Sequence, residues 1–298
     1  MPENPSEPLP QIHIPGVSDT GTPAERTNVH HVFILDASGS MQGLRQQTIT
    51  GFNEQVQNIR QLEQQFPNQR NLVTLVVFNG TTDVRFFDTD SISLQQITEA
   101  DYDPDGSTRL YGSVGETLTR LRDTLGDRCS SERVMITIMT DGADNVRDPV
   151  WSQTTTAEFI QQVQKQFNWV VTFVGANIDV ASAAQQLNIP ISNTVAYTAS
   201  VAGTRRAFAA VAEGRTGYMM RARSAAGGQS INTDAIYSAD VSRGLDLRDA
   251  DDNAADALAY AVASSTGGSP RWLTPEQRTR LTNLVRGVPT PPATPVAP

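Results

Sequence analysis

The chain has 298 residues and a net charge of -9, which argues against a nucleic-acid-binding protein because phosphate contacts need clustered Lys and Arg, and no such cluster occurs. Its single cysteine, Cys129, excludes an intrachain disulfide. No apolar run approaches the ~18 residues of a membrane span, and the first residues lack the pattern of a secretory signal. We therefore expect a cytoplasmic protein with neither nucleic-acid nor membrane partners.

Short apolar runs alternate with helical patterns from residue 29 to about residue 213. Each run is rich in β-branched and aromatic residues and predicts a buried strand, and each apolar stripe at three- to five-residue spacing predicts an amphipathic helix. The predicted strands span 29–36, 71–78, 83–88, 133–141, 168–176 and 193–197. The predicted helices span 44–66, 110–125, 159–167, 180–187 and 201–213.

This alternation predicts an α/β fold of the doubly wound, Rossmann-like kind. We expect a mostly parallel six-stranded sheet with helices on both faces. The turn signal Asn79-Gly80 lets 83–88 pair back on 71–78 as one antiparallel edge strand. With the strand order 3-2-1-4-5-6, the strands at 29–36 and 133–141 are neighbours at the point where the order reverses.

Composition divides the chain into four segments. We expect a flexible Pro-rich leader at 1–28 and one α/β domain at 29–215. A C-terminal extension at 216–287 and a disordered Pro-rich tail at 288–298 follow. Within the extension, an alanine-rich run and a capping box followed by an apolar stripe predict helices at 251–263 and 275–286.

Five oxygen-bearing side chains are expected at one edge of this sheet. The first strand ends at Asp36, with Ser38 and Ser40 in the loop after it. The fourth strand ends at Asp141, and Thr108 precedes the second helix. Because ligands of doubly wound sheets bind at the carboxyl ends of the strands, where strand order reverses, these five side chains could converge.

All five side chains offer oxygen atoms, which are hard metal ligands. Two carboxylates and three hydroxyls suit Mg²⁺, Mn²⁺ or Ca²⁺ rather than a soft metal. Two carboxylates only balance the charge of a divalent cation, so the ion stays electrophilic and favours a further carboxylate from outside. We therefore predict a divalent-cation site, with Mg²⁺ as the first choice, at Asp36, Ser38, Ser40, Thr108 and Asp141.

The same five residues, in this order, resemble the metal-ion-dependent adhesion site of the von Willebrand factor A (integrin I-like) family. That family's pattern is Asp-x-Ser-x-Ser, a distant Thr and a distant Asp. The flanking runs at 106–111 and 140–142 are similar to the family's, and 173–189 is similar to its stand-alone bacterial members. The resemblance covers about 29–215.

This resemblance implies a protein-binding module and no catalytic residues. Ser38, Ser40 and Thr108 would coordinate the cation directly or through water, with the two aspartates bound to it or to its ligands. A protein partner would present a carboxylate to the ion, and the chain would act as an adaptor or assembly factor. By analogy with bacterial relatives, an AAA+ ATPase is one such partner.

Three other interpretations stay open. A polar strand-to-helix turn with capping serines would explain 36–40, but not Thr108 and Asp141. A metal-dependent phosphoester hydrolase would also carry an aspartate after its first strand, but dehalogenase-type enzymes need Asp-x-Asp, and the second position here is Ser38. A structural component of a phage-like or other particle would use the same site for an assembly contact.

Other polar residues near these loops have simpler interpretations. We expect Asp103, Asp105, Asp144 and Asp148 to be solvated loop acids. Trp151 is more typical of a packing residue than of a ligand contact, although it follows the Asp141 loop.

Overall fold

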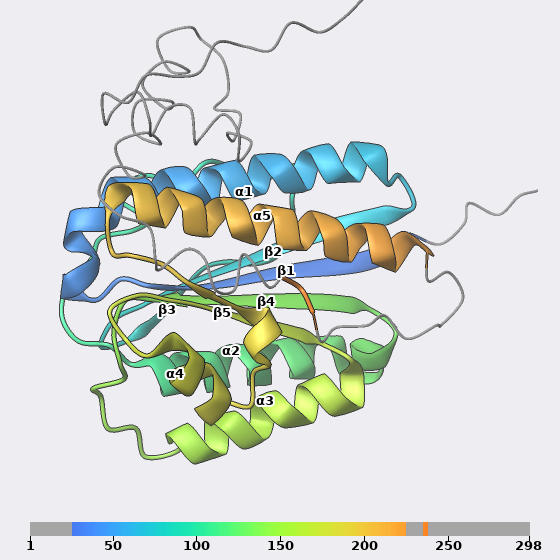
Figure 1. The fold of residues 1–298 in the computed structure, drawn as a ribbon. Coiled ribbons are helices and arrows are strands. Elements are labelled where there is room, and N and C mark those ends of the chain that lie inside the picture. Colours follow the sequence, from blue (N-terminus) through green and yellow to red (C-terminus); the bar gives the residue numbers. More distant parts are fainter. Residues whose placement is uncertain (1–25, 225–234, 238–298) are drawn as a thin grey trace, which may run out of the picture.

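The computed structural model describes residues 26–224 and 235–237, and a six-stranded sheet lies at its centre (Figure 1). Its strands are β1 (Thr27–Asp36), β2 (Gln69–Phe78), β3 (Thr82–Asp90), β4 (Arg133–Thr140), β5 (Val170–Gly175) and β6 (Thr194–Ala196). Their order is β3-β2-β1-β4-β5-β6, and only the pairing of β3 with β2 is antiparallel. The predicted fold class and strand order are confirmed.

Helices cover both faces of the sheet. They are α1 (Arg45–Gln65), α2 (Leu110–Leu125), α3 (Gln153–Phe167), α4 (Val180–Gln186) and α5 (Val201–Ser224), with short 3-10 helices at Gly39–Leu44, Gly126–Ser130 and Ile191–Asn193. Figure 1 shows α1 and α5 side by side on one face, and α2, α3 and α4 on the other. In the described part of the chain, no helix is both long enough and apolar enough to cross a membrane.

The central strand β1 separates two apolar cores. Phe33 and Leu35 belong to the core under α1 and α5, whereas Val32 and Ile34 belong to the core under α2 and α3. Side chains of a strand alternate between the two faces of a sheet. Because both faces are covered here, residues 32–35 of β1 form an unbroken apolar run in the sequence and show no alternation.

Helix α5 is longer than the sequence predicts. The expected helix at 201–213 continues to Ser224 and so crosses residue 215, the expected end of the α/β domain. Arg215 interrupts the apolar pattern, yet its side chain is completely buried, and Tyr218 one turn later is buried as well. The helices expected at 251–263 and 275–286, the tail and most of the leader lie outside the described residues.

Arg215 is held between α5, α1 and the sheet. Its Nη1 donates to Oε1 of Gln55, and its Nη2 lies 3.4 Å from Oγ1 of Thr137. The guanidinium carbon lies 4.4 Å from the centre of the Phe33 ring, a cation–π contact. Burial lowers the pKa of Arg215 to about 10. The side chain therefore stays charged at neutral pH inside an apolar core.

Two residues of the predicted C-terminal extension also pack on this domain. Ile236 and Tyr237 are buried; the Ile236 N–H donates to Oδ1 of Asn193 (3.0 Å), and the Tyr237 N–H donates to the carbonyl of Ser192 (3.0 Å). The Tyr237 ring lies against Gly214 of α5, where a Cβ would come within 2.6 Å of it. Part of the extension is therefore integrated into the α/β core.

The buried imidazole of His31 makes the stability of the fold depend on pH. Burial, and secondly the charge of Arg215, lowers its pKa from 6.5 to about 3, while its Nε2 lies 2.9 Å from Oδ1 of Asn71. As the pH falls below about 6.5, His31 binds a proton in the unfolded chain, whereas His31 in the folded protein stays neutral. The free energy of unfolding therefore decreases from about pH 6.5 towards pH 3.

We expect the variant His31→Gln, which retains a donor for Asn71, to be less sensitive to acid. Between pH 7 and pH 5, the free energy of unfolding should decrease by about 2 kcal/mol less in this variant than in the wild type. This difference corresponds to the interval of about 1.5 pH units between the ordinary His pKa and pH 5. Urea denaturation followed by circular dichroism at both pH values measures this difference. Equal losses in the two proteins would contradict the assignment of a neutral His31.

Candidate metal centre

Asp36 ends β1 and is completely buried at the junction of β1 with β4. Its Oδ1 accepts a hydrogen bond from the Ser38 N–H (2.7 Å), and its Oδ2 accepts one from the Thr140 hydroxyl (2.6 Å). Leu35 pairs with Met139 across these parallel strands, so Asp36 and Thr140 are the next residues along. The register of the sheet therefore decides which side chain supports the carboxylate.

The electrostatic state of Asp36 follows from this enclosure. Burial raises the pKa of Asp36 above its ordinary value, and the hydrogen bonds from Thr140 and Ser38 oppose that shift. The charge of Asp141 adds to the rise. A cation beside the two carboxylates would remove their mutual repulsion.

Ser38, Ser40 and Asp141 form a chain of hydrogen-bonded oxygens. The hydroxyls of Ser38 and Ser40 lie 3.1 Å apart, and the Ser40 hydroxyl donates to Oδ1 of Asp141 at 2.6 Å. Ser38 and Asp141 are buried, whereas Ser40 is exposed. The exposed Ser40 hydroxyl therefore joins two residues that are buried at the edge of the sheet.

Thr108 is brought to the same edge by its backbone. The Asp105 N–H donates to the carbonyl of Ala37 (2.8 Å), which fastens this loop to the one after β1. The Thr108 N–H donates to Oδ1 of Asn145 (2.7 Å), and the Asn145 N–H donates back to the Thr108 carbonyl (2.9 Å). Thr108 is buried, and a Cβ on Gly142 would lie 3.9 Å from its hydroxyl.

The five residues are thus joined to different degrees. Ser38, Ser40 and Asp141 share side-chain hydrogen bonds, and Asp36 joins them through the Ser38 backbone. Among the described residues, no hydrogen bond links the Thr108 hydroxyl to the other four, although its position beside Gly142 places it at the Asp141 loop.

Three supporting residues were not identified from the sequence. The Thr140 hydroxyl donates a hydrogen bond to the Asp36 carboxylate, and the Asn145 side chain accepts one from the Thr108 N–H. The hydroxyl of buried Tyr102 donates to the Asp36 carbonyl at 2.5 Å. Thr140 could have been found, because the parallel pairing of the two strands places it beside Asp36. Tyr102 and Asn145 lie in irregular loops, where no sequence periodicity indicates in which direction a side chain points.

The interpretation of Asp148 as a solvated acid is wrong. Its side chain is only 3% exposed and forms an ion pair with Arg109, the residue after Thr108. Hydrogen bonds from the backbone of Trp151, then of Val150, lower the pKa of Asp148, and Arg109 adds to the effect. Asp103 and Asp105 are exposed, as expected.

The side chains at this edge fit a hard divalent cation. Within residues 26–224 and 235–237, no three His, Cys, Asp or Glu side chains gather where they could hold a metal ion, so a cation here needs hydroxyl ligands. Neighbouring oxygens around an octahedral Mg²⁺ lie about 3 Å apart, from metal–oxygen distances of 2.0–2.1 Å. The spacings of 3.1 Å and 2.6 Å along the Ser38–Ser40–Asp141 chain are close to that value.

No protein-family model matches the chain, and no curated protein matches it. Solved structures similar to it include von Willebrand factor type A from Catenulispora acidiphila, at 18% identity and a TM-score of 0.46, covering 64% of this chain and 43% of that one. Another is proximal thread matrix protein 1 from the mussel byssus, at 14% identity and a TM-score of 0.45, covering 63% and 46%.

A third is the manganese-loaded TRAP protein of Plasmodium vivax, at 16% identity and a TM-score of 0.41, covering 59% of this chain and 69% of that one. This chain therefore spans less than half the length of the bacterial and the mussel protein. A von Willebrand factor type A structure is thus among the matches, and the likeness is one of fold alone.

We expect Thr140→Val to destabilise the protein by about 1–3 kcal/mol, because it leaves a buried carboxylate oxygen of Asp36 without its donor. Thr172→Val is the matched control, since the Thr172 hydroxyl is equally buried but donates to a neutral carbonyl, that of Ile136 (3.0 Å). Urea denaturation of the two variants measures the difference. A smaller loss for Thr140→Val than for the control would contradict the supporting role of Thr140.

Proposed function

We propose that this protein is a metal-dependent protein-binding module. A divalent cation, with Mg²⁺ as the first candidate, would be held by Asp36, Ser38, Ser40, Thr108 and Asp141 and would bind an acidic side chain of a partner protein. The observation that carries the proposal is the hydrogen-bonded chain of oxygens in which exposed Ser40 joins buried Ser38 to buried Asp141. An ion held there would have its open coordination position towards solvent.

The positions of the described histidines favour binding over catalysis. A hydrolase needs a general acid or base within reach of its substrate. The two described histidines are bonded elsewhere: His30 to Asp88 and Glu132, and His31 to Asn71. We therefore propose a module without enzymatic activity, in preference to a phosphoester hydrolase.

The role in the cell rests on the family resemblance. An adaptor or assembly factor needs one reversible contact with a partner, and a carboxylate–cation bond would provide it. An AAA+ ATPase remains a predicted partner on that analogy alone. A component of a phage-like or other particle would use the same contact and remains the alternative.

Direct titration with Mn²⁺ or Mg²⁺ tests the cation site. We expect Asp141→Ala to weaken Mn²⁺ binding at least tenfold, because it removes one of two carboxylates that balance the ion. Asp103→Ala is the matched control: it removes an acid from a neighbouring loop, 73% exposed and outside the proposed ligand set. Isothermal titration calorimetry that gives equal affinities for the two variants would refute the site.

A pull-down from cells that express the protein tests the partner contact. We expect partners to be retained in Mg²⁺ and lost both in EDTA and with Asp141→Ala, because the contact needs the ion. Partners that bind equally in all three conditions would contradict a metal-mediated contact. Turnover of p-nitrophenyl phosphate that disappears with Asp36→Ala would instead favour the hydrolase.

A further inference from the structure

Tyr197, the residue directly after β6, carries a buried hydroxyl that has no hydrogen-bond partner among residues 26–224 and 235–237. Its side chain is 1% exposed and belongs to the apolar core under α1 and α5. A buried hydroxyl without a hydrogen bond is destabilising, so the great majority of such groups in native proteins are paired with protein or with ordered water. The Tyr197 hydroxyl therefore marks a position where a water or a ligand is expected.

The backbone places Tyr197 at the same edge of the sheet as Asp141. The Tyr197 N–H donates to the carbonyl of Gly175 (2.9 Å), and the Ala176 N–H donates to the carbonyl of Thr140 (3.1 Å). Both bonds continue the parallel ladders one residue past the ends of β5 and β6. Because Asp141 directly follows Thr140, the residues Asp141, Ala176 and Tyr197 stand at one level across this edge.

The hydroxyl of Tyr197 is influenced by the carboxylates of the candidate cation site. Burial raises the pKa of Tyr197 well above its ordinary value, and among its neighbours Asp141 adds most to this rise, followed by Tyr102 and Asp36. Two neighbouring strand spacings separate β6 from β4, about 10 Å. Only the small side chain of Ala176 lies between them in this core at that level. A tyrosine side chain covers most of this distance but not all of it.

The Asp141 carboxylate has an oxygen that can take a further hydrogen bond. Its Oδ1 accepts one from the Ser40 hydroxyl (2.6 Å), and within the described part of the chain its Oδ2 accepts none. Tyr197 thus has an unused donor, and Asp141 has an unused acceptor. A water molecule that makes hydrogen bonds with both would satisfy the two groups, and buried waters typically occupy such positions.

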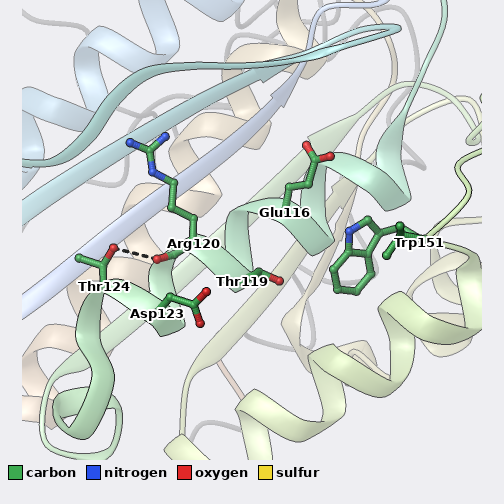
Figure 2. Close-up of a pocket in the computed structure, with 7 residues that line it drawn as sticks. Glu116, Thr119, Arg120, Asp123, Thr124 and Trp151 are labelled. Atoms are coloured by element: carbon green, nitrogen blue, oxygen red, sulfur yellow. Dashed lines mark hydrogen bonds between the residues drawn. The ribbon is translucent and has the colours of Figure 1, made fainter.

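The charged groups along α2 show the opposite situation. Figure 2 shows the residues that line a groove of about 670 Å³ there, on the face of the sheet opposite α1 and α5. Glu116 accepts two hydrogen bonds from Arg109 (2.6 and 2.9 Å), and Asp123 pairs with Arg122 at 2.8 Å. These acids have their partners within the chain and indicate no ligand. The Tyr197 hydroxyl differs because it is buried and unpaired.

We propose that Tyr197 is a positioning residue of the candidate cation site, whose hydroxyl donates to a buried water that donates in turn to Asp141. The proposal rests on the proposed function, because Asp141 is one of the proposed ligands. With Ser40 on one side and this water on the other, the carboxylate would be oriented before the ion binds. Hydrogen bonds of this kind to a ligating carboxylate raise the affinity of a site for its metal.

The variant Tyr197→Phe tests the water bridge, because it removes the hydroxyl and keeps the ring. We expect its Mn²⁺ affinity, measured on the full chain from the EPR signal of free Mn²⁺, to be about tenfold lower than that of the wild type. Tyr237→Phe is the matched control. The Tyr237 hydroxyl is also buried in this core, but its ring lies against Gly214 of α5, and its removal should leave the Mn²⁺ affinity unchanged.

A second pair of variants shows whether Tyr197 acts through Asp141. In an Asp141→Ala background the carboxylate that the water would orient is gone, so adding Tyr197→Phe should not lower the Mn²⁺ affinity further. A general loss of packing would lower the affinity in both backgrounds. An equal loss with and without the Asp141 carboxylate therefore overturns the positioning role.

A crystal structure of the Mn²⁺-loaded wild type shows the bridge itself. We expect a water within hydrogen-bond distance of both the Tyr197 hydroxyl and the Asp141 carboxylate. Absence of this water, or equal Mn²⁺ affinity of Tyr197→Phe and the wild type, overturns the proposal and leaves the cation site standing. A wild-type protein that binds no Mn²⁺ refutes the proposed function itself, and the role of Tyr197 with it.

Discussion

The constraint on which this edge of the molecule depends is the burial of the Asp36 carboxylate. A charged group without water needs hydrogen bonds or a counter-charge. Here the donors come from Thr140 on the neighbouring strand and from the backbone of Ser38, while Tyr102 binds the carbonyl of the same residue. The contact with Thr140 requires β1 and β4 to be adjacent and in register, so the pairing of these strands positions the carboxylate of the candidate metal centre.

Arg109 has a comparable role on the outer side of the same edge. Its guanidinium joins Glu116 of α2 to Asp148 of the long loop before α3, and its backbone N–H donates to the Asn79 carbonyl after β2 (2.7 Å). One arginine thus fixes three chain segments around Thr108. Bidentate pairing with a planar guanidinium provides this rigidity, which a flexible lysine would not. The acids of this region therefore divide into supporting residues such as Asp148 and candidate ligands such as Asp141.

The sequence allowed the six strands, their order and the candidate site residues to be predicted. Apolar runs such as 29–36 indicate buried strands because both faces of the sheet are covered, and the connections of a parallel sheet restrict the topology. Two kinds of feature could not be predicted. The end of α5 was placed too early because a buried Arg215 looks like a surface residue in an apolar pattern. Asp148 was misassigned because its partner, Arg109, is 39 positions away.

The sequence by itself determined the chemical nature of the candidate site: two carboxylates and three hydroxyls on three loops, a set that suits a hard divalent cation. Residue type and spacing carry that information, since they fix which oxygens are present and where each strand ends. Only the tertiary structure decided which residues support the site, namely Thr140 and Tyr102 at Asp36 and Asn145 at Thr108. These depend on side-chain directions and on loop contacts between distant segments, which follow from packing in three dimensions.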